Sequence, residues 1–211
     1  GDVSTLADWI TTSPSTVFFG GAGVSTESGI PDFRGANGFY FQEREIPLET
    51  VLSIDFFTQH PEAYWEWFHE IYRPVEPNGA HRTLAALEAA GRLDAVITQN
   101  IDGLHQRAGS RTVWELHGNW ERLVCTACGS VAALRDAITV DGDPVPACPS
   151  CGGQMRPDIV MYGESLDEAV IEAAVSAIAR ASTLIVAGTS LVVYPAAGLI
   201  NYFSGDHLVL M

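Results

Sequence analysis

The chain alternates short apolar runs with segments in which apolar residues recur at helical spacing. The runs are rich in β-branched and aromatic residues and are bounded by turn residues, which is typical of strands. Strands are predicted at Thr16–Phe19, Leu93–Thr98, Thr112–Leu116, Thr183–Ala187 and His207–Met211. Because helical patterns lie between several of these strands, the fold class is predicted as α/β, with a Rossmann-like, mostly parallel sheet.

Two amphipathic helices are predicted between the strands. The helix from Leu166 to Arg180 has apolar positions 166, 170, 171, 174 and 178 on one stripe. Ser165, with Glu168 three residues later, is the predicted cap of this helix. A second helix is predicted from about His81 to Ala90, and Gly91 ends it.

Two segments interrupt the alternation of strands and helices. Residues 36–76 carry aromatic and apolar residues at helical spacing, which favours a buried helical insertion over a ligand cage. These residues are Tyr64, Trp65, Trp67, Phe68, Ile71 and Tyr72. Residues 123–154 contain all four cysteines and have little apolar periodicity, so something other than a hydrophobic core must hold them.

We therefore expect a larger, Rossmann-like domain and a smaller one. The larger domain would consist of residues 1–35, 77–122 and 155–211, and the smaller would combine a helical module, 36–76, with a metal module, 123–154. Since the chain ends inside a predicted strand, we expect the larger domain to be truncated at Met211 and to continue in the parent protein.

Composition and charge narrow the class of partner. The 211 residues are 47% hydrophobic, which suits a packed core. They include 11 basic and 26 acidic residues, and the net charge of −15 repels nucleic acid but would attract a basic peptide. The longest apolar stretch, 183–200, is broken by Gly188 and Pro195, so no membrane span is predicted. Without a recognisable signal peptide, we expect a cytoplasmic location. We also expect a monomer.

The cysteines have the spacing of a metal site. Cys125 and Cys128 form one C-x2-C pair, and after nineteen residues Cys148 and Cys151 form a second. This is the pattern of a four-thiolate zinc ribbon. Disulfides are the alternative, but they are uncommon without a secretory signal. Four protein ligands leave no open coordination position, so the predicted zinc is structural.

A glycine-rich turn follows the first strand. Gly21 and Gly23 supply the G-x-G of a phosphate-binding turn, and Ser25 and Thr26 could cap a short helix after it. The match to the dinucleotide fingerprint is incomplete, because Thr26 replaces the third glycine and no acid-tipped strand follows at about 20 residues. Such a turn can be purely structural. Packing gives no reason for Asp32, Phe33 and Arg34 to occur together in the loop that follows. They therefore indicate a nucleotide-binding site.

Polar residues also follow the next two strands. Gln99-Asn100-Ile101-Asp102 comes after Leu93–Thr98, and His117 comes after Thr112–Leu116. The carboxyl ends of parallel strands meet at one edge, where α/β sheets bind ligands. His117 is therefore a candidate general base. Taken singly, Asn100 and Asp102 could merely shape a turn. The remaining histidines, expected to be exposed or hydrogen-bonded structural residues, are His60, His69, His81, His105 and His207.

Six motifs together resemble a bacterial sirtuin of the Sir2 family. They are GAGVSTESGIPDFRG, TQNIDGLHQRAG, ELHGN, the two C-x2-C pairs, IVMYGE and GTSLVVYPA, in one order from about Val17 to Met211. The resemblance implies an NAD-dependent protein lysine deacetylase, with NAD as co-substrate, one structural zinc ion, and acylated lysine on proteins or peptides as substrate.

The resemblance also assigns site residues. The implied catalytic residues are His117, Asn100 and Asp102. The implied NAD contacts are Gly21, Ala22, Gly23, Ser25, Thr26, Ile30, Asp32, Phe33, Arg34, Gln99, Asn100, Ile101, Asp102, Gly188, Thr189 and Ser190. In the family's reaction the acyl oxygen displaces nicotinamide from the ribose. Neutral His117 would then deprotonate a ribose hydroxyl, and water would finally release lysine and O-acyl-ADP-ribose, while Phe33 shields the reacting face.

The substrate peptide would bind as an added strand. Its implied contacts are Val160, Gly163, Glu164, Ser165, Val192, Val193 and Tyr194, with Val160 accepting from the acyl-lysine N–H. Residues 61–80 lack the Tyr-x-x-Arg pair of relatives that prefer acidic acyl groups, so an acetyl or longer neutral acyl group is expected.

Two alternative functions stay open at this point. One is protein mono-ADP-ribosyl transfer, and the other is a non-catalytic zinc-ribbon binding module.

Overall fold

The computed structural model describes residues 3–32, 46–137 and 143–211. Its larger sheet has five parallel strands in the order β3-β2-β1-β7-β8. The strands are β1 (Thr16–Gly20), β2 (Ala95–Thr98), β3 (Val113–Glu115), β7 (Thr183–Ala187) and β8 (His207–Leu210). All five predicted strands and their parallel arrangement are thus confirmed, with shifts of one or two residues at some ends.

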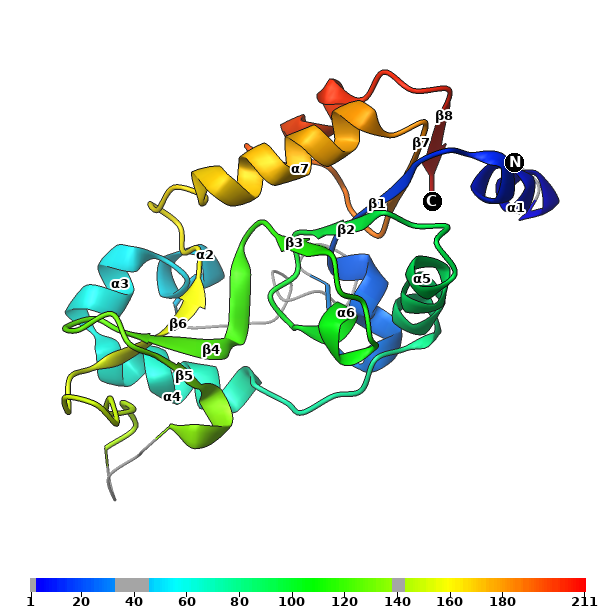
Figure 1. Ribbon diagram of the computed structural model, residues 1–211. Coiled ribbons are helices and arrows are strands. Elements are labelled where there is room, and N and C mark those ends of the chain that lie inside the picture. The colour runs from blue at the N-terminus through cyan, green and yellow to red at the C-terminus, as the bar shows by residue number, and fades with distance from the viewer. Residues whose placement is uncertain (1–2, 33–45, 138–142) are drawn as a thin grey trace.

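Helices cover both faces of this sheet, with α7 on one side and α5 on the other (Figure 1). Strand β1 turns Val17 and Phe19 to one hydrophobic cluster and Phe18 to another. Both faces are therefore buried, which explains why the strands read as continuous apolar runs rather than as an alternating pattern. The surrounding helices are α1 (Val3–Thr12), η1 (Ala22–Ser28), α5 (Gly79–Ala89), α6 (Leu104–Arg107), α7 (Glu168–Arg180) and η4 (Ala196–Tyr202).

The two predicted helices exist, but one cap differs. Helix α7 begins at Glu168, and the Asp167 side chain accepts hydrogen bonds from the amides of Ala169 and Val170. The prediction of Ser165 as the cap is wrong, because Asp167 lies closer to the first free amides. Helix α5 begins two residues earlier than predicted. Gly91 follows its C-terminal end with φ of 69°, as expected of a terminating glycine.

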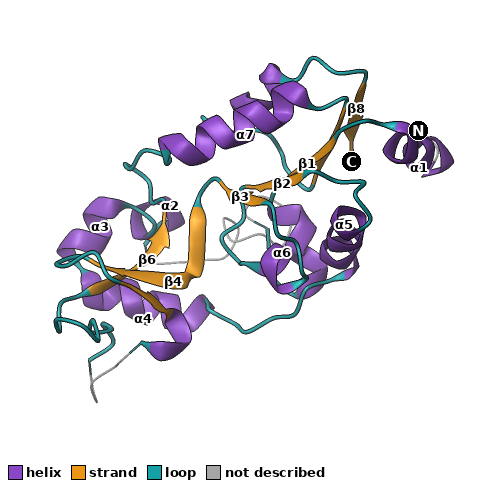
Figure 2. Cartoon of the chain, in the orientation of Figure 1, coloured by secondary structure: helices purple, strands orange, loops and turns teal. Residues whose placement is uncertain are grey.

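The smaller layer pairs a three-stranded antiparallel sheet with a group of helices (Figure 2). The strand order is β5-β4-β6, with β4 at Gly118–Cys125, β5 at Val131–Ala133 and β6 at Met155–Ile159. The helices are α2 (Leu48–Val51), α3 (Ile54–Gln59), α4 (Pro61–Ile71) and η3 (Leu134–Asp136). This sheet was not predicted, and β6 joins it through pairing with β4.

The aromatic stripe of α4 forms the core of this layer. Tyr64, Trp65 and Phe68 are buried and pack in one cluster with Leu123 and Met155 of the small sheet. The interpretation of the stripe as core is thus confirmed. The same cluster contains two of the cysteines, so the helices and the cysteine segment share one core. Within the described residues, no helix is long and apolar enough to cross a membrane.

Candidate functional site

The strand ends meet as the sequence predicts. Because β1, β2, β3 and β7 are parallel, the loops after their carboxyl ends lie along one edge of the sheet. The chain passes from β1 to β2 and β3 on one side and later returns to β7 on the other. This reversal of strand order is where open α/β sheets bind nucleotides. The glycine-rich loop and the 188–190 turn face each other there.

The two loop glycines are required for packing. The Gly21 amide donates to the Ala187 carbonyl at 3.2 Å, and the Gly23 amide donates to the Gly188 carbonyl at 2.8 Å. A Cβ atom on Gly23 would lie 2.8 Å from the Gly188 Cα atom. The absence of side chains thus lets the loop lie directly on the turn after β7. From the sequence, these glycines were expected as part of a phosphate-binding turn.

The loop continues as the 3-10 helix η1, whose N-cap is Gly21 without a side-chain hydrogen bond. The prediction that Ser25 and Thr26 cap it is wrong. Thr26 donates its hydroxyl back to the Gly23 carbonyl at 3.0 Å. Ser25 is buried and donates to the Asp102 carboxylate at 2.6 Å, so its side chain belongs to the site rather than to the helix end.

Asn100 and Asp102 complete this buried group. The Asn100 side-chain amide donates to the Gly21 carbonyl at 3.0 Å and to the Ser25 hydroxyl at 3.2 Å. One oxygen of Asp102 accepts from Ser25, and the other accepts from the Leu104 amide at 3.0 Å. Asp102 therefore shapes the turn into α6, as the structural alternative supposed, and also anchors the glycine-rich loop.

His81 belongs to the same group, and the sequence did not single it out. Its Nδ1 atom accepts from the Asn78 amide at 3.2 Å, which places the proton of the neutral ring on Nε2, 3.4 Å from the Ser25 hydroxyl. Burial lowers the pKa of His81 and favours that neutral form. The pair Asn78 and His81 caps helix α5, but nothing local in the sequence points to Ser25.

The remaining histidines were expected to be exposed or hydrogen-bonded, and His105 differs from this expectation. His60 and His69 are exposed, and His207 stacks on Trp9 at 4.3 Å between ring centroids. His105 is buried against His81, and neither of its ring nitrogens has a hydrogen-bond partner among the described residues. It is thus neither exposed nor hydrogen-bonded, and burial lowers its pKa to about 3.

His117 has the geometry of a general base. It follows β3, and its Nδ1 atom lies 2.9 Å from the Gln99 carbonyl oxygen. A carbonyl can only accept, so Nδ1 carries the proton and Nε2 keeps its lone pair. Burial lowers the pKa of His117, and the hydrogen bond to Gln99 opposes this shift without reversing it. The ring is therefore neutral near physiological pH.

Gln99 connects the ends of several strands. Its backbone amide donates to the Gly20 carbonyl at 3.0 Å, and its side-chain amide donates to the Thr189 hydroxyl at 2.9 Å. Together with the contact to His117, these bonds join the loops after β1, β2, β3 and β7. Ser190 is exposed beside this group.

The remaining predicted NAD contacts flank this centre or lie outside the description. Ile30 and Ile101 are half-buried against the cluster of the smaller layer. Asp32 is the last described residue of its segment. Phe33 and Arg34 lie outside the described residues.

The predicted peptide contacts lie on two segments. One follows β6, where the Val160 amide donates to the His117 carbonyl at 2.9 Å and thus lies close to the proposed base. Gly163 and Ser165 are exposed, and Glu164 between them is half-buried. The other segment follows β7, where Val192 and Tyr194 are 52% and 71% exposed, large values for apolar side chains. Both segments leave surface open for a partner.

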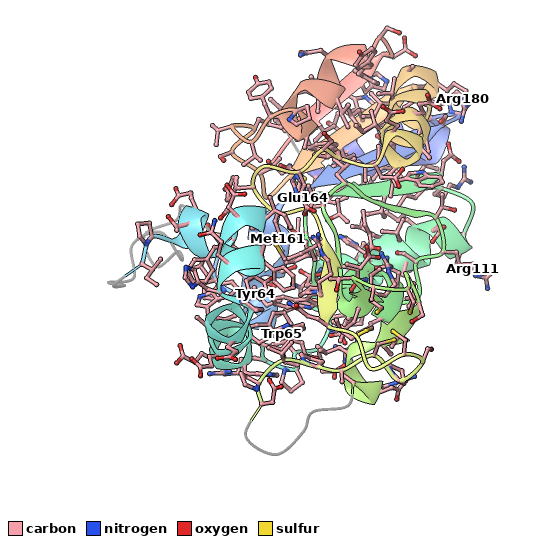
Figure 3. All side chains as sticks on the ribbon, turned by 90° about the vertical axis from the view of Figure 1, so that its left-hand side faces the viewer. Tyr64, Trp65, Arg111, Met161, Glu164 and Arg180 are labelled. Atoms are coloured by element: carbon pink, nitrogen blue, oxygen red, sulfur yellow. The ribbon has the colours of Figure 1, made fainter. Side chains whose placement is uncertain are left out.

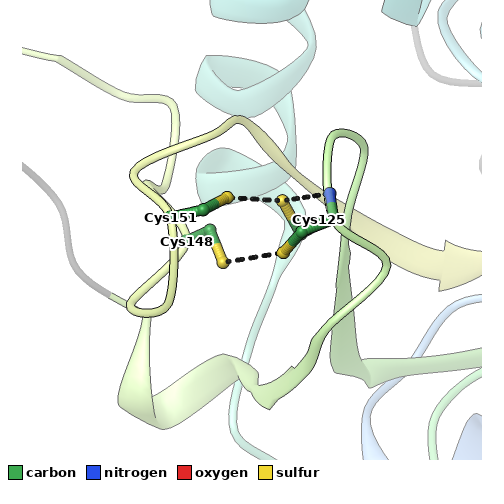
Figure 4. Close-up of side chains that lie close together, drawn as sticks. Cys125, Cys148 and Cys151 are labelled. Atoms are coloured by element: carbon green, nitrogen blue, oxygen red, sulfur yellow. Dashed lines mark hydrogen bonds between the residues drawn. The ribbon is translucent and has the colours of Figure 1, made fainter.

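The four cysteines converge as a metal site. Their sulfur atoms all lie within 4.8 Å of one another. Two of these distances are 3.6 Å (Cys125 to Cys151) and 3.8 Å (Cys128 to Cys148), and Figure 4 shows the labelled side chains turned toward a common centre. A tetrahedral zinc ion with Zn–S bonds of about 2.3 Å needs sulfur atoms about 3.8 Å apart. The donor set therefore fits a four-thiolate zinc ion.

The surrounding backbone also suits thiolates. The amides of Ala127 and Ser150 approach the Cys125 and Cys148 sulfur atoms at 3.4 Å each, as in a tight knuckle. The Ser130 hydroxyl lies 3.0 Å from the Cys148 sulfur. Such donors stabilise negative charge on metal-bound sulfur. The four sulfurs leave no position for a substrate, as the sequence predicts.

Replacing Gly23 by alanine is expected to destabilise the chain by about 1–3 kcal/mol, because the new methyl group would overlap the Gly188 backbone. Gly79→Ala is the matched control. It lies at the start of α5 with no atom within 4 Å of the added Cβ, so stability should be unchanged or slightly higher. Urea unfolding measures both. Equal midpoints for the two variants would contradict the packing role of Gly23.

Comparisons with known proteins agree with this geometry. The model of the Sir2 family matches residues 21–195. An NAD-dependent protein deacetylase of Clostridium acetobutylicum is 50% identical over 213 residues, covering 99% of this chain and 86% of the relative. One of Thermotoga maritima is 46% identical over 210 residues, covering 97% of this chain and 84% of the relative.

Solved structures of Sir2 proteins share the fold. One with a p53 peptide and NAD+ has a TM-score of 0.86 at 44% identity, and one bound to an acetylated peptide has a TM-score of 0.85 at 43% identity. Each match covers 100% of this chain and 86% of the other. These findings confirm the resemblance that the six motifs indicated. The chain belongs to the Sir2 family.

Proposed function

We propose that this chain is an NAD-dependent protein lysine deacetylase. It converts acetyl-lysine and NAD to lysine, nicotinamide and O-acetyl-ADP-ribose, which agrees with the NAD-dependent protein deacetylase activity for which its relatives are named. The observation that carries the proposal is the state of His117. Its Nδ1–H is held by the Gln99 carbonyl, and its Nε2 lone pair is left for a substrate proton at the edge where the strands end.

The site residues fit NAD by their chemistry. Ser25, Asn100 and Asp102 form a buried hydrogen-bonding group at the reversal of strand order, where a ribose and a nicotinamide amide could exchange hydrogen bonds with them. When bound, NAD supplies a ribose carbon from which nicotinamide can leave. The NAD contacts assigned by family resemblance, including Asp32, Phe33, Arg34, Gly188, Thr189 and Ser190, are part of this proposal.

In the proposed reaction His117 accepts a proton from a ribose hydroxyl at Nε2. The Gln99 carbonyl keeps the ring in the required tautomer and stabilises the protonated ring afterwards. Asn100 and Asp102 orient the ribose and the nicotinamide end. The peptide lies between 160–165 and 192–194 as an added strand, and Val160 accepts from the acyl-lysine N–H.

The proposal extends to partners, location and domains. The net charge of −15 favours basic peptide segments around the lysine over nucleic acid, and we propose a monomer. A cytoplasmic location agrees with the four cysteines being free rather than paired in disulfides. The division into a larger domain (1–35, 77–122 and 155–211) and a smaller one (36–76 and 123–154) is also proposed, with the difference that residues 118–122 of β4 and 155–159 of β6 lie in the small sheet.

The experiment is a series of acyl-lysine peptides incubated with NAD, in which nicotinamide release and peptide mass are read together. An acetyl or longer neutral acyl group should be removed faster than an acidic one. Mono-ADP-ribosyl transfer is the alternative function that uses the same cleavage of NAD. A peptide that gains ADP-ribose while keeping its acyl group would favour that alternative.

The pH dependence follows from the buried base. His117 acts in its neutral form, and burial lowers its pKa, so kcat/KM should be constant above the lowered pKa and fall with acid below it. The acid limb of the kcat/KM profile is expected below about pH 6.5, the ordinary pKa of histidine. Initial rates at low peptide concentration between pH 5 and 8 measure it. An acid limb clearly above pH 7 would contradict a desolvated base at this position.

A further inference from the structure

The loop after β6, residues 160–164, carries proposed peptide contacts, yet the Glu164 side chain does not face a peptide. Its two carboxylate oxygens accept from the two Nη atoms of Arg156, at 2.6 and 2.7 Å. One of these oxygens also accepts from the Met161 amide at 2.9 Å. Figure 3 labels Met161 and Glu164 side by side, where the helical module meets the rest of the chain.

Arg156 is held as firmly as its partner. Its guanidinium also donates to the Ile159 carbonyl at 2.9 Å, and its Cζ atom lies 5.8 Å from the centre of the Phe57 ring. The Arg156 and Glu164 side chains are only 19% and 25% exposed, so solvent screens the pair weakly. A bidentate pair of this kind fixes direction as well as distance.

The same loop makes three backbone hydrogen bonds to two other parts of the chain. The Val160 amide donates to the His117 carbonyl at 2.9 Å. The Tyr162 amide donates to the Leu52 carbonyl at 2.9 Å, and the Tyr162 carbonyl accepts from the Ile54 amide at 3.0 Å. Residues 160–162 thus span from the proposed base to the helical module. Glu164 closes the loop by binding both Met161 and β6.

We infer that Arg156 and Glu164 are positioning residues that set the shape of the 160–164 loop for the peptide. The inference rests on the proposed function. Because both carboxylate oxygens of Glu164 accept hydrogen bonds from within the chain, the loop would present its backbone and not this charge to the peptide. Loss of the pair would let the loop shift. A displacement of about 1 Å in the position of a bound substrate can lower catalytic efficiency by up to about 100-fold. The NAD residues Ser25, Asn100 and Asp102 make none of these contacts.

The test uses Glu164→Gln and Arg156→Lys in the full chain, since both keep side-chain volume close to the original. Arg107→Met is the control, because Arg107 also pairs with a carboxylate, Glu76 at 2.7 Å, but lies away from the loop. Peptide KM should rise about 10- to 100-fold in Glu164→Gln, with NAD KM within about twofold. Arg156→Lys should show a smaller rise because one charged donor remains, and Arg107→Met should show none.

Direct binding of an acetyl-lysine peptide, measured by fluorescence anisotropy without turnover, separates this inference from the proposed function. Weaker peptide binding in Glu164→Gln, with thermal unfolding close to that of the unsubstituted chain, supports the positioning role. Unchanged peptide binding, or an equal rise of KM for peptide and NAD, overturns it. Peptide binding without any deacetylation by the unsubstituted chain would instead overturn the proposed function.

Discussion

Replacing His117 by alanine is expected to lower kcat for deacetylation by about 10²- to 10⁴-fold, the usual contribution of a positioned general base. The reason is that the hydrogen bond from Nδ1–H to the Gln99 carbonyl fixes the tautomer in which Nε2 of His117 is unprotonated and can accept a proton. NAD binding should change by no more than about twofold, because Ser25, Asn100 and Asp102 hold one another without this ring.

Single-turnover rates and NAD binding by calorimetry measure the two effects separately. His69→Ala is the matched control, because His69 is exposed on α4 and its ring nitrogen lies 3.3 Å from the Pro144 carbonyl, away from the strand ends. Its activity should equal that of the unsubstituted chain. Full deacetylation by the His117→Ala variant would exclude histidine as the base.

Removing zinc is expected to unfold the smaller layer and leave the parallel sheet folded. Structural zinc contributes about 10–16 kcal/mol in small zinc modules, which is as large as the roughly 5–15 kcal/mol that stabilises a whole domain. Cys125 and Cys148 are buried in the same cluster as Trp65 and Met155, so loss of the metal would open this core. The clusters around β1 contain none of the cysteines.

Tryptophan fluorescence during titration with a chelator follows the change, since Trp65 and Trp120 both lie in the affected cluster. Cys125→Ser should behave like the chelated protein. Thr126→Ser, a conservative change in the same knuckle at an exposed position, should keep its metal and its fluorescence. A chelated protein that loses activity but retains the native spectrum would indicate a catalytic metal, contrary to the four-thiolate arrangement.

The larger sheet could be predicted because burial on both faces gives each strand an uninterrupted apolar run. The small sheet could not. Strand β4 has a register shift between Asn119 and Leu123, and β6 includes Pro157 between two charged residues. Strand β4 lacks the alternation that marks a strand, whereas β6 alternates but contains a proline, which argues against a strand inside a sheet. Their pairing depends on the shared core and the cysteine cluster, which are long-range properties.

The placement of candidate site residues was predictable where they directly follow a strand end, as for His117 and for Gln99–Asp102. It was not predictable where a side chain acts across the chain. Ser25 lies beside His81 although 56 residues separate them, and Glu164 has the right position for a peptide contact but uses its side chain on Arg156. Only the fold places such pairs together.

The fate of the acetyl group distinguishes NAD-dependent deacetylation from simple hydrolysis and from ADP-ribosyl transfer. A peptide whose lysine carries an isotopically labelled acetyl group is incubated with NAD, and the label is followed by mass spectrometry at early times. We expect the label to move to ADP-ribose and one nicotinamide to be released for each acetyl group removed. Label released as free acetate without nicotinamide, or a peptide that keeps its label and gains ADP-ribose, would contradict it.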